Sequence, residues 1–368
     1  MKRIQCIYFD AGGGHRAAAN ALKSVIEQQK RPWEISLVNL QELLYSLDVF
    51  RKITGISLED IYNRMLASGW TLGSGIGLRL MHGVIRMYHG AMLPLLAGHF
   101  RATKPDLVVS LVPNFNRPIF QSLKRTLPGV RYVTILTDFA DYPPHFWIER
   151  QDQYLVCGTA KAGEQARAMG YPPDHVFSAS GMILRPKFYE PVNVDRGEAR
   201  KKLGLDPERT TGVVLFGGQG SSVMTEIAER LGDTQLILIC GRNEELAAKL
   251  RAMRRAAPHF VEGFTTEVPF YMHLADFFIG KPGPGSISEA IAMKLPVIVE
   301  SNAWTLPQER YNTEWVREQQ VGLVLMNFRR IDRAARQLEA ALPEYRARVA
   351  AIQNRAVFEI PEFLNRLL

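Results

Sequence analysis

IGKPGPGSISEAIAMKLPVIVESNAWTLPQERYN, residues 279–312, is the stretch that decides the fold. It begins at the end of an apolar run, residues 277–279, which is typical of a buried strand. A turn at residues 280–285 follows, and its glycines and prolines fix a tight bend and keep side chains off its inner surface. We expect a helix to begin at Ser286 or Ser288, with the serine as its N-cap.

The N-terminus of this predicted helix is a candidate phosphate site, because it presents unpaired N–H groups and the positive end of the helix dipole. Glu289 falls in its first turn. A second apolar strand is predicted at residues 296–299, and a loop with Gln308 and Glu309 follows it. A phosphate site followed by this pair of hydrogen-bonding side chains suits a nucleotide sugar. Taken alone, the turn indicates no more than a strand-to-helix connection.

The length of 368 residues predicts about two domains. With 46% hydrophobic and 22% charged residues, the composition is that of a globular protein. Cys6, Cys157 and Cys240 lie far apart in apolar runs, which indicates buried free thiols in a reducing compartment. The sequence shows neither a signal-peptide pattern nor an apolar run near the roughly 20 residues of a membrane-spanning helix. We therefore expect a cytoplasmic protein.

The net charge of +8 suggests either nucleic acid or an anionic membrane surface as a partner. Zinc-finger spacing and aromatic platforms between basic residues are absent from the sequence, so we expect no nucleic acid partner. The basic residues are spread over many predicted helices. Membrane contact and an ordinary solvated basic surface both stand as interpretations of this charge.

A second glycine loop follows the first predicted strand, residues 4–9. It contains Gly13 and Gly14, ends at His15, and leads into an alanine-rich helix predicted over residues 16–29. Its spacing matches neither the dinucleotide fingerprint nor the P-loop. A histidine at such a helix entry is accessible and can hold a proton near neutral pH, although it can also serve only to cap a turn. The presence of two glycine loops favours the catalytic interpretation.

Residues 78–96 predict an amphipathic helix. At about 100° per residue, Arg79 and Arg86 fall along one basic stripe, and a Met- and Leu-rich face that includes Met92 lies opposite. Such a helix suits a membrane interface. A helix that packs on the domain core with a solvated basic face is an equal alternative. Pro94 is expected to end or kink the helix.

Asp138 follows a predicted strand at residues 132–136, where open α/β sheets place ligand groups. Asp138 and Asp141 resemble a metal-binding pair of carboxylates, but no histidine or further carboxylate cluster in the sequence supports a metal. We therefore expect no metal site and a structural or orienting role for Asp138.

Both halves of the chain open with a strand, a glycine loop and a helix, which predicts two α/β, Rossmann-like domains that face a central cleft. The first domain is expected at residues 1–185 and a linker at 186–208. The second domain is expected at residues 209–345. A helical tail at residues 346–368 is expected to pack back on the first domain.

Five motifs in order carry a resemblance to a known family. They are DAGGGHRAAA at residues 10–19, GGQG at 217–220, GF at 263–264, KPGPGSISEA at 281–290, and QE with a later Asn at 308–312. In these motifs the chain resembles the monogalactosyldiacylglycerol synthase family of processive diacylglycerol glycosyltransferases. It also looks like their relative, the peptidoglycan-precursor N-acetylglucosaminyltransferase. The resemblance covers nearly the whole chain and implies a GT-B fold.

The resemblance also implies a role for each matching position. His15 would be the catalytic base, and the acceptor-side loops would contribute Gly13, Gly14, Asn114, Asn116 and Asp138. The backbone around Phe264 would hold uracil, Glu289 would lie near the ribose, and Gln308 with Glu309 would bind the sugar. The implied nucleotide-sugar site comprises Gly217, Gly218, Gln219, Gly263, Phe264, Gly283, Pro284, Gly285, Ser286, Glu289, Gln308 and Glu309.

The implied reaction is an inverting transfer with no cofactor and no obligatory metal. His15 removes a proton from the acceptor hydroxyl as this attacks the anomeric carbon, and helix N–H groups stabilise the departing diphosphate. Two departures from the family pattern leave the sugar and the acceptor open. Residues 304–307 precede Gln308 where plant-type enzymes have a glycine, and Asn114 and Asn116 stand where a histidine-containing pattern is expected.

The leading hypothesis is a peripheral enzyme, on the inner face of an anionic membrane, that moves a hexose from a UDP-sugar to diacylglycerol. A polyprenyl-linked or soluble acceptor is one alternative. A UDP-sugar-binding protein without transfer activity is another, and His15, Gln308 and Glu309 argue against it.

Overall fold

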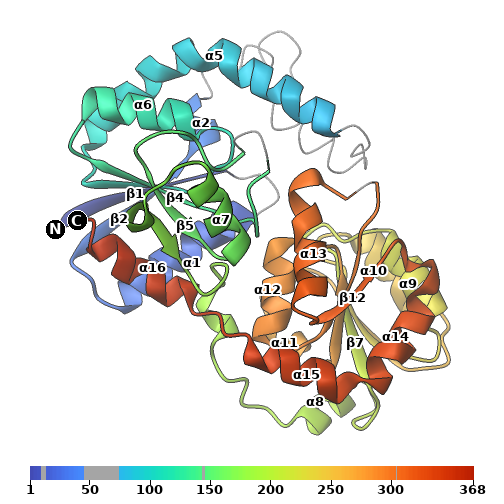
Figure 1. The fold of residues 1–368 in the computed structure, drawn as a ribbon. Helices are drawn as coiled ribbons and strands as arrows, with labels where there is room; N and C mark the ends of the chain where they lie inside the picture. Colours follow the sequence, from blue (N-terminus) through green and yellow to red (C-terminus); the bar gives the residue numbers. More distant parts are fainter. Residues whose placement is uncertain (10–13, 45–73, 143–145, 304) are drawn as a thin grey trace. The chain divides into compact units, whose positions relative to one another are not determined.

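The computed structural model describes residues 1–9, 14–44, 74–142, 146–303 and 305–368. The chain forms two compact units, each built on one six-stranded parallel sheet with helices on both faces (Figure 1). The first unit comprises Met1–Pro186, Leu306–Gln308 and Asn354–Leu368, and the second comprises Lys187–Thr305 and Glu309–Gln353. The predicted α/β class with two Rossmann-like sheets is confirmed.

The sheet of the first unit has the strand order β2-β1-β3-β4-β5-β6, and all neighbouring strands are parallel. The strands are β1 (Lys2–Tyr8), β2 (Trp33–Asn39), β3 (Leu107–Ser110), β4 (Arg131–Ile135), β5 (Tyr154–Cys157) and β6 (Val176–Ser178). Because helices cover both faces of such a sheet, its strands consist of nearly continuous apolar runs. Alternate residues of β1 show this: Ile4 and Cys6 pack in one core, and Ile7 packs in another.

Helices from both ends of the chain cover this first sheet. They are α1 (Gly14–Gln28), α2 (Leu40–Leu44), α5 (Ser74–Thr103), α6 (Asn116–Thr126), α7 (Ala160–Ala168) and α16 (Ala356–Asn365), with a 3-10 turn η2 (Pro173–His175). The core beside Ile4 contains Leu22 of α1 together with Ile360 and Phe363 of α16. The last helix is therefore part of the first unit.

Helix α5 includes the segment predicted to be amphipathic and continues through Pro94 to Thr103. Met92 is only 5% exposed and packs with Leu96 and Phe100 in the core of the first unit. The prediction that Met92 faces a membrane is therefore wrong, because the apolar side of this part of the helix is already buried against the sheet. Arg86 is exposed. The side chain of Arg79 lies outside the part of the structure that is described.

The sheet of the second unit has the strand order β12-β11-β10-β7-β8-β9, again parallel throughout. The strands are β7 (Thr211–Leu215), β8 (Gln235–Ile239), β9 (His259–Glu262), β10 (Phe277–Gly280), β11 (Val297–Glu300) and β12 (Gly322–Leu325). The helices are α8 (Arg196–Lys202), α9 (Val223–Arg230), α10 (Glu244–Arg251), α11 (Val268–His273), α12 (Pro284–Ala292), α13 (Arg310–Glu318), α14 (Ile331–Ala340) and α15 (Leu342–Ala351). Its 3-10 turn is η5 (Phe328–Arg330), and two further 3-10 turns, η3 (Pro186–Phe188) and η4 (Pro307–Glu309), contain residues of both units.

The stretch expected as a linker, residues 186–208, is folded onto the second unit by helix α8. Arg200 is buried and donates to Asp276 Oδ2 at 2.7 Å and to the Leu274 carbonyl at 2.9 Å. Arg196 donates to Asp276 Oδ1 at 2.7 Å. These bonds tie α8 to the residue that precedes β10, and Lys187–Thr305 all belong to the second unit.

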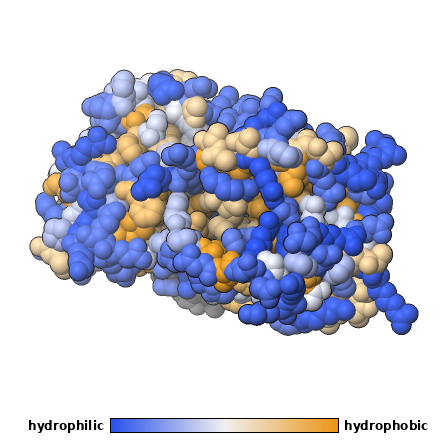
Figure 2. All heavy atoms as spheres, turned by 90° about the horizontal axis from the view of Figure 1, so that it is seen from below, coloured by the Kyte–Doolittle hydropathy of each residue, from blue (hydrophilic) through white to orange (hydrophobic). Residues whose placement is uncertain are grey.

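Hydrophilic residues cover most of the face shown in Figure 2, and hydrophobic residues gather in smaller groups between them. Cys6, Cys157 and Cys240 are buried free cysteines, as the sequence predicts, and burial raises the pKa of each thiol. Of the helices that the structure describes, none combines the length and the apolar character needed to cross a membrane.

Candidate functional site: a nucleotide-sugar site and a half-buried histidine

In the second unit the strand order reverses between β7 and β10. Ligands of open α/β sheets bind outside the carboxyl ends of the strands at such a switch point. The loop Gly217–Ser221 follows β7, and Lys281–Gly283 follows β10, so the two predicted glycine loops lie at this place. Gly217 has a φ of +77°, which favours glycine.

Helix α12 begins earlier than the sequence predicts. Gly283 is its N-cap, Pro284 is its first residue, and no side chain caps it. The prediction that Ser286 or Ser288 is the N-cap is wrong, because Pro284 has a φ suited to the first helical turn and needs no N–H partner there. The helix N-terminus remains at the glycine turn, and an α-helix leaves its first N–H groups without intrahelical partners. Gly285 and Ser286 are therefore placed to donate to a phosphate.

Lys281, the first residue of the motif at residues 281–290, links the elements of this site, although the sequence predicts no role for it. Its Nζ lies 3.8 Å from Glu309 Oε1. A Cβ atom added at Gly283 would lie 3.3 Å from Lys281 Cε and 3.7 Å from Glu309 Oε1, and one added at Gly217 would lie 3.8 Å from Lys281 Cε. The lysine therefore places a positive charge between both glycine loops and the acidic residue predicted to bind the sugar.

A hydrogen bond from the side chain of Asn312 stabilises the turn Lys281–Gly283. This side chain is fully buried, and Nδ2 donates to the Pro282 carbonyl at 2.8 Å. Gln308 and Glu309 lie in η4; Gln308 is half-buried, and Glu309 is buried. Burial raises the pKa of Glu309, and the nearby Lys281 ammonium opposes this rise. Such a carboxylate can accept hydrogen bonds strongly from sugar hydroxyls.

The loops after β8 and β9 carry an exposed aromatic residue. Phe264 is 57% exposed, and the Arg242 guanidinium carbon lies 4.8 Å from its ring centroid. The backbone N–H of Arg242 donates to the Gly218 carbonyl at 2.9 Å, which connects this pair to the loop after β7. The backbone N–H of Gly263 donates to Glu262 Oε1 at 2.9 Å. A flat, exposed ring beside a cation suits a nucleobase, and Arg242 carried no signal in the sequence that would have selected it.

Other predicted donor residues lie at the same carboxyl edge. Gly218 and Gln219 are exposed in the loop after β7. Glu289 is half-buried in α12, one turn after its start. All of the predicted donor residues except Gln308 thus belong to the second unit.

In the first unit, His15 is the second residue of α1 and is half-buried. Its Nδ1 lies 2.9 Å from Thr137 Oγ1, and its ring centroid lies 5.7 Å from that of Trp147. Burial lowers the pKa of His15 to about 4. The imidazole is therefore neutral near pH 7 and has one unprotonated nitrogen that can accept a proton.

Trp147, which sequence reasoning missed, is fully buried and held by two aspartates. Its Nε1–H donates to Asp138 Oδ2 at 2.8 Å, and its backbone N–H donates to Asp141 Oδ1 at 2.6 Å. Asp138 therefore orients the indole ring that packs beside His15. Its carboxylate acts through Trp147 in this network, in line with the orienting role expected from the sequence.

Asn116 does not face an acceptor. It is buried, its Nδ2 donates to the Val112 and Trp147 carbonyls, and its Oδ1 accepts from Tyr132 and Thr134. The acceptor-side prediction for Asn116 is wrong, because every hydrogen-bonding position of this amide is used within the core.

The remaining acceptor-side residues are Gly13, Gly14 and Asn114. Gly14 is the exposed first residue of α1, and Asn114 is half-buried with a φ of +67°. Gly13 lies outside the described residues. In the part of the chain that the structure describes, His, Cys, Asp and Glu side chains do not gather in threes or more that could hold a metal.

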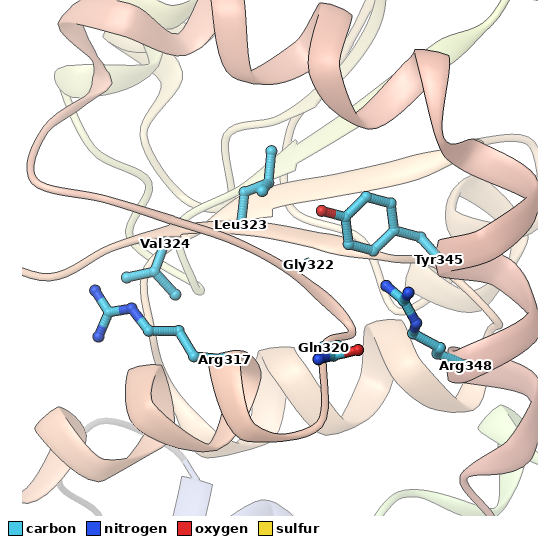
Figure 3. Close-up of a pocket in the computed structure, with 7 residues that line it drawn as sticks. All are labelled: Arg317, Gln320, Gly322, Leu323, Val324, Tyr345 and Arg348. Atoms are coloured by element: carbon cyan, nitrogen blue, oxygen red, sulfur yellow. The ribbon is translucent and has the colours of Figure 1, made fainter.

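The second unit has an open hollow of about 440 Å³ (Figure 3). Its lining comprises Arg317, Gln320, Gly322, Leu323, Val324, Tyr345 and Arg348. Gln320 and Gly322 stand at the amino end of β12, whereas the donor residues follow the carboxyl ends of their strands. The hollow is therefore not the nucleotide-sugar site.

Known proteins resemble this chain in both sequence and fold. The glycosyltransferase family 28 C-terminal domain matches residues 213–348. The chain is 28% identical over 395 residues to the probable monogalactosyldiacylglycerol synthase 2 of Oryza sativa subsp. japonica, covering 100% of this chain and 81% of that protein. It is 26% identical over 356 residues to the monogalactosyldiacylglycerol synthase of Spinacia oleracea, covering 91% of this chain and 66% of that protein.

Solved structures agree on the fold. MurG of Acinetobacter baumannii has a TM-score of 0.64 at 12% identity, with 100% of both chains covered. The calicheamicin glycosyltransferase CalG4 has a TM-score of 0.63 at 14% identity, with 100% of this chain and 99% of that chain covered. The site in the second unit lies within the region that matches family 28. The chain thus has the GT-B fold and is a glycosyltransferase of the hexosyltransferase class, and its sequence is similar to those of the monogalactosyldiacylglycerol synthases.

Proposed function

We propose that the protein transfers a hexose from a UDP-sugar to diacylglycerol. The observation that carries the donor assignment is the position of Lys281, which lies beside Glu309 and between two glycine loops at the switch point of the second sheet. In that position its ammonium neutralises a diphosphate, the N-terminus of α12 donates to the same group, and Glu309 accepts from sugar hydroxyls. Phe264 and Arg242 face the base.

The chemistry of the transfer follows from these groups. The acceptor hydroxyl oxygen forms a bond to the anomeric carbon, and its proton passes to the neutral imidazole of His15. The bond between the anomeric carbon and the diphosphate oxygen breaks, and UDP leaves with the electron pair. Lys281 and the N–H groups of α12 stabilise the negative charge that develops on the leaving group. Attack opposite the leaving group inverts the anomeric configuration.

Similarity over the whole chain to proteins named monogalactosyldiacylglycerol synthases supports diacylglycerol as the acceptor. The net charge of +8 and the exposed Arg86 on α5 support peripheral binding to an anionic membrane, which we place at its cytoplasmic face. Met92 is buried in the core and does not contribute to this binding.

A vesicle assay tests the proposal. Radiolabelled UDP-galactose, UDP-glucose and UDP-N-acetylglucosamine are incubated separately with the protein and anionic vesicles, with or without diacylglycerol. We expect label in the lipid fraction only with diacylglycerol, and a loss of about 10²–10⁴ in rate for His15→Ala with UDP binding retained. Transfer to a polyprenyl phosphate but not to diacylglycerol would overturn the acceptor assignment. Binding without turnover would indicate a non-catalytic protein.

A further inference from the structure

His15, at the start of α1, contacts Thr137, which follows the carboxyl end of β4. The two residues are 122 positions apart in the chain. Thr137 Oγ1 lies 2.9 Å from Nδ1, a normal hydrogen-bond distance. Trp147 packs beside the same ring, and Asp138 and Asp141 hold the tryptophan in turn. The imidazole orientation is thus determined by core residues of the first unit.

A neutral imidazole has one N–H, and the partner of one ring nitrogen decides which nitrogen carries it. If Thr137 Oγ1 accepts, Nδ1 carries the proton and Nε2 is unprotonated. If the Thr137 hydroxyl donates instead, Nδ1 is the acceptor and Nε2 carries the proton. Only the first arrangement leaves the nitrogen on the side away from Thr137 able to accept a proton.

We propose that Thr137 is the positioning residue of the catalytic base: its Oγ1 accepts the Nδ1–H of His15, so that Nε2 takes the proton of the acceptor hydroxyl. The kinetic part of this inference rests on the proposed function. In the reaction, Nε2 gains the proton while Nδ1 keeps its own, and the resulting imidazolium still donates to Thr137. The proton returns to solvent after UDP leaves.

The partner of this base is a hydroxyl and carries no charge. Among the described residues of this network, the carboxylates of Asp138 and Asp141 accept N–H groups of Trp147, and Arg16 follows His15 on the exposed side of α1. The hydroxyl orients the imidazole without adding a negative charge, so burial keeps the ring neutral. A carboxylate at position 137 would instead stabilise the imidazolium.

A measurement on the protein alone tests the tautomer. Nitrogen NMR of the full chain labelled in histidine distinguishes protonated from unprotonated ring nitrogens, and a His15→Gln sample identifies the His15 signals among those of eight histidines. At pH 7 we expect a protonated Nδ1 and an unprotonated Nε2. The reverse pattern would overturn the proposal. Because this needs no substrate, a failed vesicle assay would count against the proposed function and not against this result.

Three substitutions at Thr137 supply the kinetic test. Thr137→Val, of nearly equal volume, is expected to lower kcat at least about tenfold with little change in the donor KM, and Thr137→Ser to retain most of the activity. Thr137→Asp should move the acidic limb of the kcat/KM profile to higher pH, since the carboxylate raises the pKa of the imidazole. Equal losses in the Val and Ser variants, or full activity of the Val variant, would overturn the proposal. Thermal unfolding of each variant identifies any loss caused by misfolding.

Discussion

Lys281 and Glu309 form a pair whose two side chains differ in exposure, 47% for the lysine and 11% for the glutamate. The exposed ammonium is free to turn toward a ligand, whereas the carboxylate of Glu309, the last residue of η4, is buried. A pair of this kind adds little to the stability of the folded chain, because solvent screens the lysine. Its value lies in placing opposite charges where a diphosphate and a sugar would bind.

Removing the lysine should weaken donor binding. Lys281→Met is expected to lower the affinity for UDP by about 1.5–3 kcal/mol, the usual contribution of a charged hydrogen bond. Isothermal titration calorimetry measures this, with Lys249→Met on the exposed side of α10 as the matched control. A second variant, Lys281→Met with Glu309→Gln, removes the buried charge that the single change leaves unpaired. Unchanged affinity in both would contradict the role of Lys281.

Glu309→Gln should stabilise the unliganded protein at neutral pH and weaken sugar binding. Burial raises the pKa of Glu309, so the folded state binds its proton more tightly than the unfolded state does. Its contribution to stability is complete below the unfolded pKa and is lost as the pH rises through the folded pKa. We expect a gain of about 0.5–2 kcal/mol at pH 7 that shrinks toward pH 4. Denaturant unfolding at both pH values checks this, and a gain that is larger at pH 4 would contradict it.

At the level of elements, the loops after β7 and β8 approach each other backbone to backbone. Gly241 has a φ of +60°, and a Cβ atom added there would lie 2.3 Å from the Gly218 carbonyl oxygen. Gly220 has a φ of +62°, and its added Cβ would lie 2.6 Å from the Cys240 carbonyl oxygen. These glycines allow the loop that is predicted to face the phosphates to pack against the loop that carries Arg242.

Gly241→Ala should therefore displace the glycine loop as a whole. We expect a loss of about 1–3 kcal/mol in stability from the strained backbone, together with weaker UDP binding. Gly129→Ala is the control, because an added Cβ there meets no atom within 4 Å. Thermal unfolding and calorimetry with UDP measure the two effects. A Gly241→Ala variant as stable and as tightly binding as the control variant would contradict the contact.

At the level of the whole molecule, each unit has its own core. In the first, Ile360 of α16 is 1% exposed and packs with Ile4 and Leu22. The second has a separate core that includes Ile279, Leu238 and Leu338. Residues from the C-terminus of the chain thus stabilise the unit that begins at the N-terminus.

Ile360→Ala should destabilise the first unit and leave the donor site intact. Removing this buried side chain is expected to cost about 2–5 kcal/mol. UDP at 100 times its dissociation constant should stabilise the second unit by about 2.7 kcal/mol in both the variant and the wild type. Differential scanning calorimetry with and without UDP separates the two effects. An equal loss of UDP binding and of first-unit stability would show that the units do not fold separately.

Much of the architecture follows from local sequence. The strands are continuous apolar runs because helices bury both faces of each sheet, and glycines mark the turns where backbones approach each other. The motifs around Gly217, Phe264 and Gly283 predicted residues that do lie on one sheet edge. The carboxyl ends of parallel strands necessarily share that edge.

Tertiary structure decided the rest, because the contacts concerned join residues that are distant in the chain. A periodic pattern shows that one face of α5 is apolar, but only packing shows that Met92 meets a core and not a lipid. The local sequence does not predict the roles of Asn116 and Trp147. Each role depends on which buried polar groups need a hydrogen-bond partner once the core has folded. The contact of His15 with Thr137, across 122 positions, exists only once β1 and β4 lie in one sheet.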